Sequence, residues 1–518
     1  MTIVEFEFDT LYYWAAWFFK FKGWNVNRIF AHCSFAVSML LVLLVSSLAF
    51  GQFGEVQAPP NQLKPGFDFI TPERCESFLD VLAGPAFEGR GSGQIGYTKA
   101  AHWVAGRVAQ WGFQPVGDGG TFFQLMPVTR KIPVLAETQI MGPGGLELSG
   151  EGNIGFERYT DAAIISGEIV FLDVRGANPS IPENIPLRDK IVLYSVDEAA
   201  AAVTPRLLAQ NRPTAAIRII DGVPTSRPQI IFEGRRRRST SVSGTMSRSA
   251  ASAIMKACGL REPTLQNPGT IIRPTQEKLS IRLRMREVKA TTPNVVALLE
   301  GSDPNLKHEY VVLGAHLDHL GHRGGQIYYG ADDNGSGSSA VLAIAEAMAN
   351  NPVKPKRSVL FMWFAAEEVG LVGSRYYTEH PLLPLENMTC MLNIDMVGRN
   401  EETSEETSAD NEGHIHLVGS RRGESDLHNL ILSTNRHIGF EFEYDEERVF
   451  SRSDQINFYR KGVPVAFLFG GFHPDYHQTT DQRGKINYHK IATAARLFYL
   501  TAYAAADHGR FELKADDQ

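Results

Sequence analysis

Residues of the types that bind metals follow four separate apolar stretches in the second half of the chain. Each stretch is a predicted strand. The residues and their preceding strands are His316 and Asp318 after 310–313, Glu367 and Glu368 after 359–364, Asp395 after 391–392, and His477 after 465–469. Asp333 lies in a loop, 330–335, directly before a predicted helix. Because open α/β sheets bind ligands at the carboxyl ends of their strands, these side chains are expected to converge in one crevice.

The chemistry that fits this set is a pair of metal ions. Two imidazoles and three carboxylates suit two Zn²⁺ ions that share one carboxylate. Two such ions, roughly 3.5–4 Å apart, can hold a bridging hydroxide and polarise a carbonyl. Glu367 and Glu368 are interpreted as a divided pair, because neighbouring side chains at a strand end point in different directions. One can then bind metal while the other takes a proton from water.

Each signal is weak alone, because a His-x-Asp pair is common on surfaces, Asp333 could cap a helix, and a Glu-Glu pair is usually solvated. Four strand ends that all carry such residues favour a metal site over chance. His308, His319, His322 and His473 are interpreted as bystanders, although His319 could line the crevice. The sequence has no His-Glu-x-x-His helix, no Gly-x-Ser-x-Gly elbow and no phosphate-binding glycine loop.

The elements around these residues predict an α/β fold. From about residue 290 onward, continuous apolar strands alternate with helices, which indicates a mainly parallel central sheet covered by helices on both faces. Thr71 and Pro72 predict a helix start. The segment 141–289 changes to short β-like runs separated by Pro/Asn/Gly loops, and is predicted to be a smaller β-rich inserted domain. The acidic stretch 401–412 is predicted to be a polar surface loop.

The amino-terminal region predicts export. Residues 29–51 contain no formally charged residue and follow Lys20, Lys22 and Arg28, which favours a secretory signal peptide. The alternative is a retained membrane anchor, because about 20 apolar residues span a bilayer. Residues 1–51 are therefore a predicted signal peptide or anchor, and 52–70 a predicted linker. The protein is expected to be exported, periplasmic or secreted, with a possible membrane tether through 29–51.

Composition excludes some other classes. The net charge is −7, whereas a nucleic-acid-binding protein usually has a strongly basic face. The arginine run 235–238 lies beside Gly234 and a Ser/Thr-rich stretch, and is interpreted as a solvated loop. The four cysteines have neither zinc-knuckle nor redox spacing.

The motifs around these residues resemble the dizinc metallopeptidase family that includes aminopeptidase S, aminopeptidase Y and the glutamate carboxypeptidases. The matching segments are 314–321, 330–337, 365–371, 393–399 and 476–477, with a further likeness at 87–93. The resemblance covers most of the chain after residue 70, and the combined motifs are highly specific. It implies a zinc-aminopeptidase-like catalytic domain formed by 71–140 and 290–510. It also implies that 141–289 is similar to the protease-associated domain that some members insert.

The resemblance also implies roles for single residues and two Zn²⁺ per chain. One zinc would be held by His316, Asp333 and Asp395, and the other by Asp333, Glu368 and His477. Glu367 matches the general base, Asp318 the partner that orients His316, and Tyr476 the hydroxyl that stabilises the oxyanion. Two positions depart from the family pattern: Gln455 stands where many relatives have His, and Gln478 follows the Tyr-His pair. Both are expected in the substrate-facing region, where they would affect specificity.

The function expected from these features is zinc-dependent hydrolysis of the amino-terminal residue of peptides, with Glu367 as general base. A carboxypeptidase or other amidase on the same metal scaffold is the first alternative. It would need a basic group for the terminal carboxylate, which the sequence does not identify. A non-catalytic receptor-like ectodomain is the second alternative, although such relatives usually lose metal ligands and this chain has all five.

Overall fold

The computed structural model describes residues 56–160, 163–181, 186–201, 203–232, 242–261, 269–323, 326–422 and 426–513. By its internal contacts the chain separates into two units, one of residues 1–58 with 436–439 and the other of 59–435 with 440–518. All the elements below belong to the second unit. The signal peptide or anchor predicted over 1–51 lies outside the described residues. Within the described ranges, no helix is long and apolar enough to cross a membrane.

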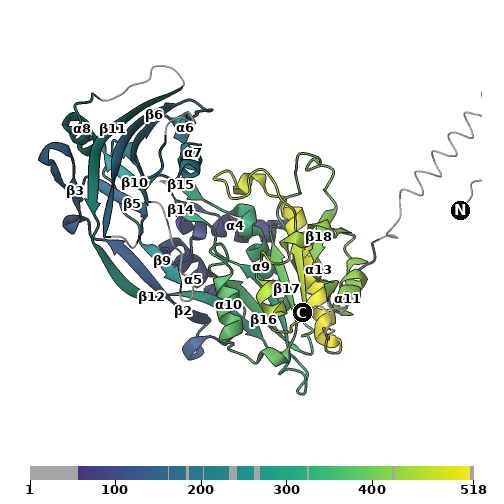
Figure 1. Cartoon of the computed structure of the whole chain (residues 1–518). Coiled ribbons are helices and arrows are strands. Elements are labelled where there is room, and N and C mark those ends of the chain that lie inside the picture. Colours follow the sequence, from purple (N-terminus) through teal and green to yellow (C-terminus); the bar gives the residue numbers. More distant parts are fainter. Residues whose placement is uncertain are drawn as a thin grey trace, which may run out of the picture. The chain divides into compact units, whose positions relative to one another are not determined.

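Ten strands of the described chain form a large mixed sheet (Figure 1), ordered β19-β18-β20-β17-β13-β16-β12-β2-β9, with β1 beside β12. The strands are β1 Gln114–Pro115, β2 Phe123–Pro133, β9 Gln229–Phe232, β12 Met285–Leu299, β13 Tyr310–His316, β16 Ser358–Phe364, β17 Met388–Asp395, β18 His414–Val418, β19 Glu441–Glu443 and β20 Val465–Phe469. The central strands β20, β17, β13 and β16 are parallel. β12, β2 and β9 add antiparallel pairs on one side, and β18 pairs antiparallel with β20 on the other. Parallel pairing thus occupies the centre of the sheet, with one further parallel pair, β18 and β19, at its edge.

Helices pack against this sheet, and adjacent residues of β16 show that both faces are covered. Because side chains alternate along a strand, Trp363 and Phe364 point to opposite faces. The Trp363 indole donates a hydrogen bond to the Ser338 carbonyl in α9, while Phe364 contacts Phe458 of α12. The helices described are α3 Lys64–Phe69, α4 Pro72–Leu82, α5 Ile95–Gln110, α6 Glu198–Ala201, α7 Thr204–Asn211, α8 Arg248–Ala257, α9 Gly337–Asn350, α10 Val372–Glu379, α11 Asp426–Asn435, α12 Gln455–Tyr459 and α13 Tyr488–Asp507.

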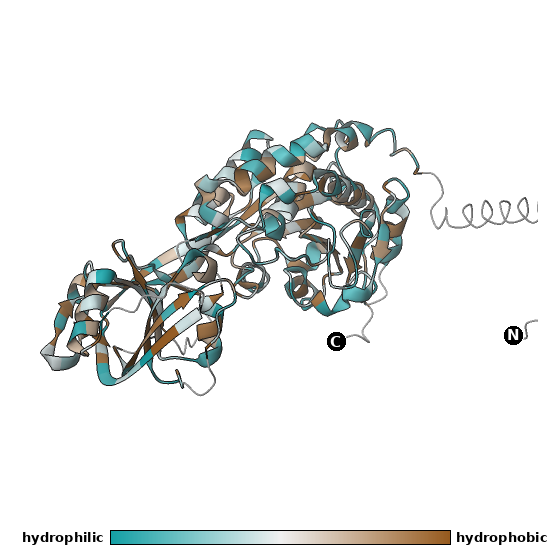
Figure 2. Cartoon of the chain, turned by 90° about the horizontal axis from the view of Figure 1, so that it is seen from above, coloured by the Kyte–Doolittle hydropathy of each residue, from teal (hydrophilic) through white to brown (hydrophobic). Residues whose placement is uncertain are grey.

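Local sequence explains where these helices begin and which face they bury. Thr71 accepts a hydrogen bond from the Arg74 N–H, so it caps α4 as predicted, with Pro72 at the first helical position. α4 buries only one stripe of its surface, including Phe78 and Leu79. Figure 2 shows the corresponding mixture of polar and apolar residues along the helices.

The segment between β2 and β12 contains a second sheet of eight described strands, ordered β4-β3-β11-β6-β7-β8-β10-β5. These strands are β3 Gln139–Met141, β4 Glu147–Ser149, β5 Ile154–Arg158, β6 Ile164–Arg175, β7 Ile191–Val196, β8 Ala215–Ile220, β10 Val242–Ser247 and β11 Gly269–Arg282. The sheet has its own apolar core, which includes Phe156, Phe171 and Ile254. The small hairpin β14 Gly321–Arg323 with β15 Gln326–Tyr328 lies apart from both large sheets.

Three expectations from the sequence need correction. Part of the predicted linker 52–70 is helix α3, because its glycine packs against Tyr499 and the flanking Leu63 and Ile70 are buried. Residues 285–289, expected in the inserted domain, belong to β12, which pairs with β2 along its length. Within the predicted polar loop 401–412, Glu401 is buried.

Candidate metal centre

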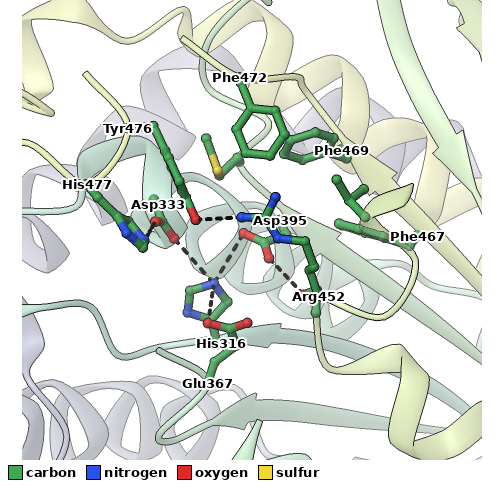
Figure 3. A pocket seen from close by; sticks show the side chains of 13 residues that line it. His316, Asp333, Glu367, Asp395, Arg452, Phe467, Phe469, Phe472, Tyr476 and His477 are labelled. Atoms are coloured by element: carbon green, nitrogen blue, oxygen red, sulfur yellow. Dashed lines mark hydrogen bonds and ion pairs between the residues drawn. The ribbon is translucent and has the colours of Figure 1, made fainter. Parts of the chain in front are cut away.

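The carboxyl ends of the parallel strands bring the predicted site residues together. His316 is the last residue of β13, and Asp395 is the last residue of β17. Glu367 follows β16, and His477 lies in the loop after β20. Figure 3 shows these side chains turned toward one another around Asp333. The sequence-based expectation of a single crevice therefore agrees with the geometry.

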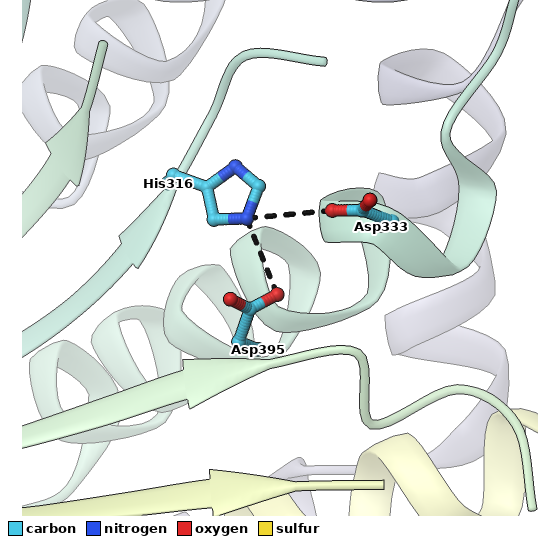
Figure 4. Close-up of side chains that lie close together, drawn as sticks. All are labelled: His316, Asp333 and Asp395. Carbon is cyan, nitrogen blue, oxygen red and sulfur yellow. Dashed lines mark hydrogen bonds and ion pairs between the residues drawn. The ribbon is translucent and has the colours of Figure 1, made fainter. Parts of the chain in front are cut away.

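One group of possible ligands surrounds the His316 ring. Its Nε2 atom lies 3.2 Å from Asp395 Oδ1 and 3.4 Å from Asp333 Oδ1. Figure 4 shows both carboxylates facing the same ring nitrogen. All three residues are buried, and Ser453 donates a hydrogen bond to the other Asp395 oxygen at 2.7 Å. This leaves one oxygen of each carboxylate directed at the imidazole.

A second group uses the other oxygen of Asp333. His477 Nε2 lies 3.1 Å from Asp333 Oδ2 and 3.1 Å from Glu368 Oε2. Asp333 therefore turns one oxygen toward His316 and the other toward His477. A carboxylate placed in this way can bridge two metal ions, which is the position that the family resemblance assigns to it.

His319 also lies against the second group, and so lines the crevice, as the sequence analysis allowed. Its Nδ1 atom lies 2.7 Å from Glu368 Oε1 and 3.6 Å from Asp333 Oδ2, and its side chain is fully buried. Its ring also meets the His477 ring edge-on, with 5.8 Å between centroids. The signal in the sequence was its place in the same strand-end motif as His316. His473, by contrast, pairs with Asp332 behind this group.

Backbone hydrogen bonds hold the loop that carries Asp333. The Asp481 carboxylate accepts hydrogen bonds from the backbone N–H groups of Asp332 and Asp333. The Asn334 side chain accepts the Met396 N–H, which ties this loop to the end of β17. The ligand loop is therefore fixed relative to Asp395 before any ion binds.

Arg90, which the sequence analysis included only within the segment 87–93, lies beneath both groups. Its guanidinium is fully buried and donates four hydrogen bonds of 2.7–2.9 Å, to the carbonyls of Leu82, Leu317, Tyr329 and Gly330. Burial lowers its pKa to about 10, so the group remains charged near neutral pH. It joins the loops before Asp333 and after His316, and supplies positive charge below the carboxylates.

Asp318 connects the His316 strand end to Glu367. His316 Nδ1 hydrogen-bonds to the Asp318 backbone carbonyl at 3.0 Å, whereas the Asp318 carboxylate lies 3.9 Å from the ring. That carboxylate accepts the Glu367 backbone N–H at 3.0 Å. Asp318 thus orients the imidazole mainly through its main chain, and positions Glu367 through its side chain.

The electrostatics of the cluster favour a cation. Burial, together with the charges of Glu368 and Asp395, raises the pKa of Glu367 well above its ordinary value. Burial also raises the pKa of Asp318 to about 7. Burial opposes protonation of His477, but hydrogen bonds to Asp333 and Glu368 raise its pKa to about 10. Buried carboxylates at this density need a counter-charge. Imidazole and carboxylate donors sharing Asp333 fit two zinc ions.

A pocket with an apolar wall opens at the cluster. Its walls include Phe467, Phe469, Phe472, Met396 and Val449, with His316, Glu367 and Asp395 at its polar end. Tyr476 lines the pocket and stacks on His477 with 3.9 Å between centroids. Burial raises its pKa, so the hydroxyl keeps its proton. Arg452 donates a hydrogen bond to that hydroxyl at 3.2 Å (Figure 3).

The sequence analysis did not identify Arg452, and it placed Gln455 incorrectly. Arg452 was overlooked, although it directly precedes the segment 453–455 that marked a departure from the family pattern. Gln455 was expected to face substrate. Instead its side chain is fully buried, bonded to Asn393 and to the Phe450 carbonyl. The period-two pattern of β20 could have indicated that Phe467 and Phe469 share a face.

Comparison with known proteins identifies the region that carries this site. Residues 294–502 match the model of Peptidase family M28. Over these residues the chain is similar to peptidase family M28. The M28 region contains all five predicted ligands, together with Glu367 and Tyr476, whereas Arg90 lies before it.

Two curated relatives share part of their length with this chain. Leupeptin-inactivating enzyme 1 from Streptomyces exfoliatus is 32% identical over 197 residues, which are 38% of this chain and 39% of the relative. Probable leucine aminopeptidase 2 from Arthroderma benhamiae is 27% identical over 280 residues, 49% of this chain and 52% of the relative. The chain thus spans about half or less of these relatives. The solved structure of a zinc aminopeptidase from Bacillus subtilis aligns over 87% of this chain and 99% of its own, at 17% identity and a TM-score of 0.49.

Proposed function

We propose that the protein is a zinc-dependent exopeptidase that removes the amino-terminal residue of peptides and holds two zinc ions per chain. The observation that carries this proposal is the position of Asp333, whose two oxygens face His316 and His477 separately. The M28 match and the names of the aminopeptidase relatives support the same activity.

When bound, zinc supplies a Lewis acid for the scissile carbonyl and lowers the pKa of water enough for attack near neutral pH. Glu367 then takes the proton of the attacking water and delivers it to the leaving amine. Its distance of 4.0 Å from His316 Nε2 keeps it beside the ligands. The protonated Tyr476 hydroxyl donates to the developing oxyanion.

The pocket supports a substrate with an apolar first residue. Three phenylalanines, Met396 and Val449 would bury an aliphatic or aromatic side chain. The free amine of the substrate would lie among the carboxylates at the polar end. The aminopeptidase relatives whose names specify leucine agree with this preference.

A carboxypeptidase activity is the second candidate function. The observation that favours it is the position of Arg452. This guanidinium lines the pocket beside Tyr476. It provides the cation that recognition of a carboxy-terminal carboxylate requires, and that the sequence alone did not identify.

A substrate panel with and without a chelator separates the candidates. We expect leucyl and phenylalanyl anilides to be hydrolysed, acetylated dipeptides with a free carboxyl terminus to be spared, and chelation to abolish turnover. Glu367→Gln should lower kcat about 10²–10⁴-fold while metal content by mass spectrometry stays unchanged. The exposed Glu405→Gln is the matched control. Full activity of Glu367→Gln would refute the assignment of the base.

We also propose that the protein is exported, on the basis of the uncharged segment 29–51 after three basic residues. Fractionation of the expressing cells and amino-terminal sequencing of the mature protein test this. An intact first residue in the soluble cytoplasmic fraction would contradict it.

A further inference from the structure

A second cluster of histidines and carboxylates lies on the edge of the large sheet, and none of its residues lines the pocket. β18 and β19 are parallel neighbours, with His414 opposite Glu441 and His416 opposite Glu443. Residues two apart on a strand share a face, so these four side chains lie on one face of the strand pair. Glu401 reaches the same place from the loop that follows β17.

Three donor atoms of this cluster converge. His416 Nε2 lies 3.1 Å from Glu401 Oε2 and 3.4 Å from Glu443 Oε2. The three donor atoms all lie within 4.8 Å of one another, and His416 and Glu401 are buried. None of the three residues belongs to the groups around Asp333.

The surrounding contacts orient these donors in the way that metal ligands are oriented. His414 Nδ1 hydrogen-bonds to Glu443 Oε1 at 2.6 Å, which leaves Oε2 turned toward His416. On the far side of the His416 ring, buried Nδ1 makes no hydrogen bond in the described part of the chain, although Asp445 Oδ1 lies 3.2 Å away. A carboxylate facing the second nitrogen of an imidazole is the usual outer partner of a histidine that binds metal.

Among the described residues, no lysine donates a hydrogen bond to Glu401, His416 or Glu443. Lys490 of α13 is the nearby ammonium group and interacts electrostatically with Glu401 and Glu443. It is buried, yet its Nζ makes no hydrogen bond within the described ranges. The oxygens that face His416 therefore remain available to an ion.

We propose that Glu401, His416 and Glu443 form a separate binding site for a divalent transition-metal ion. One imidazole nitrogen and two carboxylate oxygens are a donor set that suits Zn²⁺, with water completing the coordination. This site is distinct from the proposed catalytic pair and does not depend on it.

The site would stabilise the wall of the substrate pocket. The second Glu401 oxygen accepts the backbone N–H of Phe472 at 3.2 Å. The His416 ring lies 5.7 Å from the Phe469 ring. Phe469 and Phe472 both line the pocket. An ion at Glu401 would thus fix the segment that leads to Tyr476 and His477.

Zinc stoichiometry of the purified full-length chain tests the proposal independently of activity. Asp333→Asn should weaken both catalytic groups, so that this variant retains about one strongly bound Zn²⁺ by calorimetry and mass spectrometry. Adding His416→Gln should remove that ion, while adding His414→Gln should only weaken its binding about 10-fold. Circular dichroism checks that each variant folds.

A milder variant keeps the test decisive if His416→Gln does not fold. Glu443→Gln in the otherwise unchanged chain should lose one zinc per chain and should lose part of the rise in Tm that added Zn²⁺ produces. Equal zinc content in the unchanged chain, Glu443→Gln and His416→Gln would overturn the proposal, and would leave His416 as a histidine paired with carboxylates. Loss of zinc only in Asp333→Asn would support the catalytic pair and also overturn the separate site.

Discussion

Replacement of Arg90 by methionine tests whether a buried cation holds the ligand loops in place. Methionine has a similar length and no donors, so Arg90→Met removes the guanidinium hydrogen bonds to four carbonyls, three of them buried, although the Gly330 carbonyl still accepts the Gly335 N–H. A hydrogen bond from a charged donor contributes about 1.5–3 kcal/mol, and the desolvation cost of the guanidinium, which the variant avoids, offsets part of the sum. We expect a loss of about 4 kcal/mol in the free energy of unfolding.

That loss converts into a measurable change in Tm. Unfolding entropy is about 2.1 cal/mol/K per residue, so roughly 450 folded residues give about 1 kcal/mol/K and a fall in Tm of about 4 °C. Differential scanning calorimetry measures the shift, with the exposed Arg206→Met as the matched control. Zinc affinity should also fall, about 10–100-fold, because the loops before Asp333 and after His316 lose their common anchor.

Two effects of Arg90 on the metal site have opposite signs, which makes the result informative. Loss of the anchor weakens zinc binding, whereas loss of a nearby positive charge strengthens it. If Arg90→Met bound zinc more tightly and melted within 1 °C of the unchanged chain, Arg90 would be an electrostatic neighbour only. The claim that Arg90 holds the two ligand loops in place would then be refuted.

Three further predictions concern single residues. Ser453→Ala removes the hydrogen bond that orients Asp395, and should weaken zinc binding about 10-fold in a competition assay with a chromophoric chelator; unchanged affinity would contradict this. Tyr476→Phe should lower kcat on leucyl anilide about 10²–10³-fold with little change in KM, and a change confined to KM would instead indicate a role in substrate binding. Because burial lowers the pKa of Lys490 from 10.5 to about 8, the unfolded chain binds more protons between these pH values, so stability should rise as pH increases through that window, by up to about 3 kcal/mol. Melting curves should show this rise in the unchanged chain but not in Lys490→Met.

The sequence could predict the centre of the fold but not its flanks. Continuous apolar runs such as 359–364 identify strands buried on both faces, and those strands are the parallel ones. The strands β2 and β12 were harder to assign, because their outer parts are half exposed and carry charged residues such as Lys131 and Glu287. No local signal tells a strand at a sheet flank from a strand of a neighbouring domain, which is why 285–289 was assigned to the inserted segment.

For the site, residue type and strand position were sufficient to find the ligands. His316 and Asp395 end their strands, so topology alone directs them to one edge. The sequence could not predict the supporting contacts, because they join residues far apart in the chain, such as Arg90 and Gly330. Glu401 shows the same limit, since an acidic stretch usually indicates solvent exposure, and only the tertiary fold brings His416 to it.

The position of Arg90 explains how so many carboxylates can fold together before an ion binds. A cation placed among the ligands would compete with zinc. Arg90 instead donates its hydrogen bonds to backbone carbonyls, and interacts with Asp333 and Asp318 only through its charge. The guanidinium is therefore able to reduce the repulsion among the carboxylates while leaving their oxygens free. By this reasoning the metal-free protein is folded but less stable, and saturating zinc should add about 4 kcal/mol at a concentration 1,000 times Kd. A chelated sample that lost its near-ultraviolet circular dichroism signal at 25 °C would show that Arg90 is not sufficient for this role.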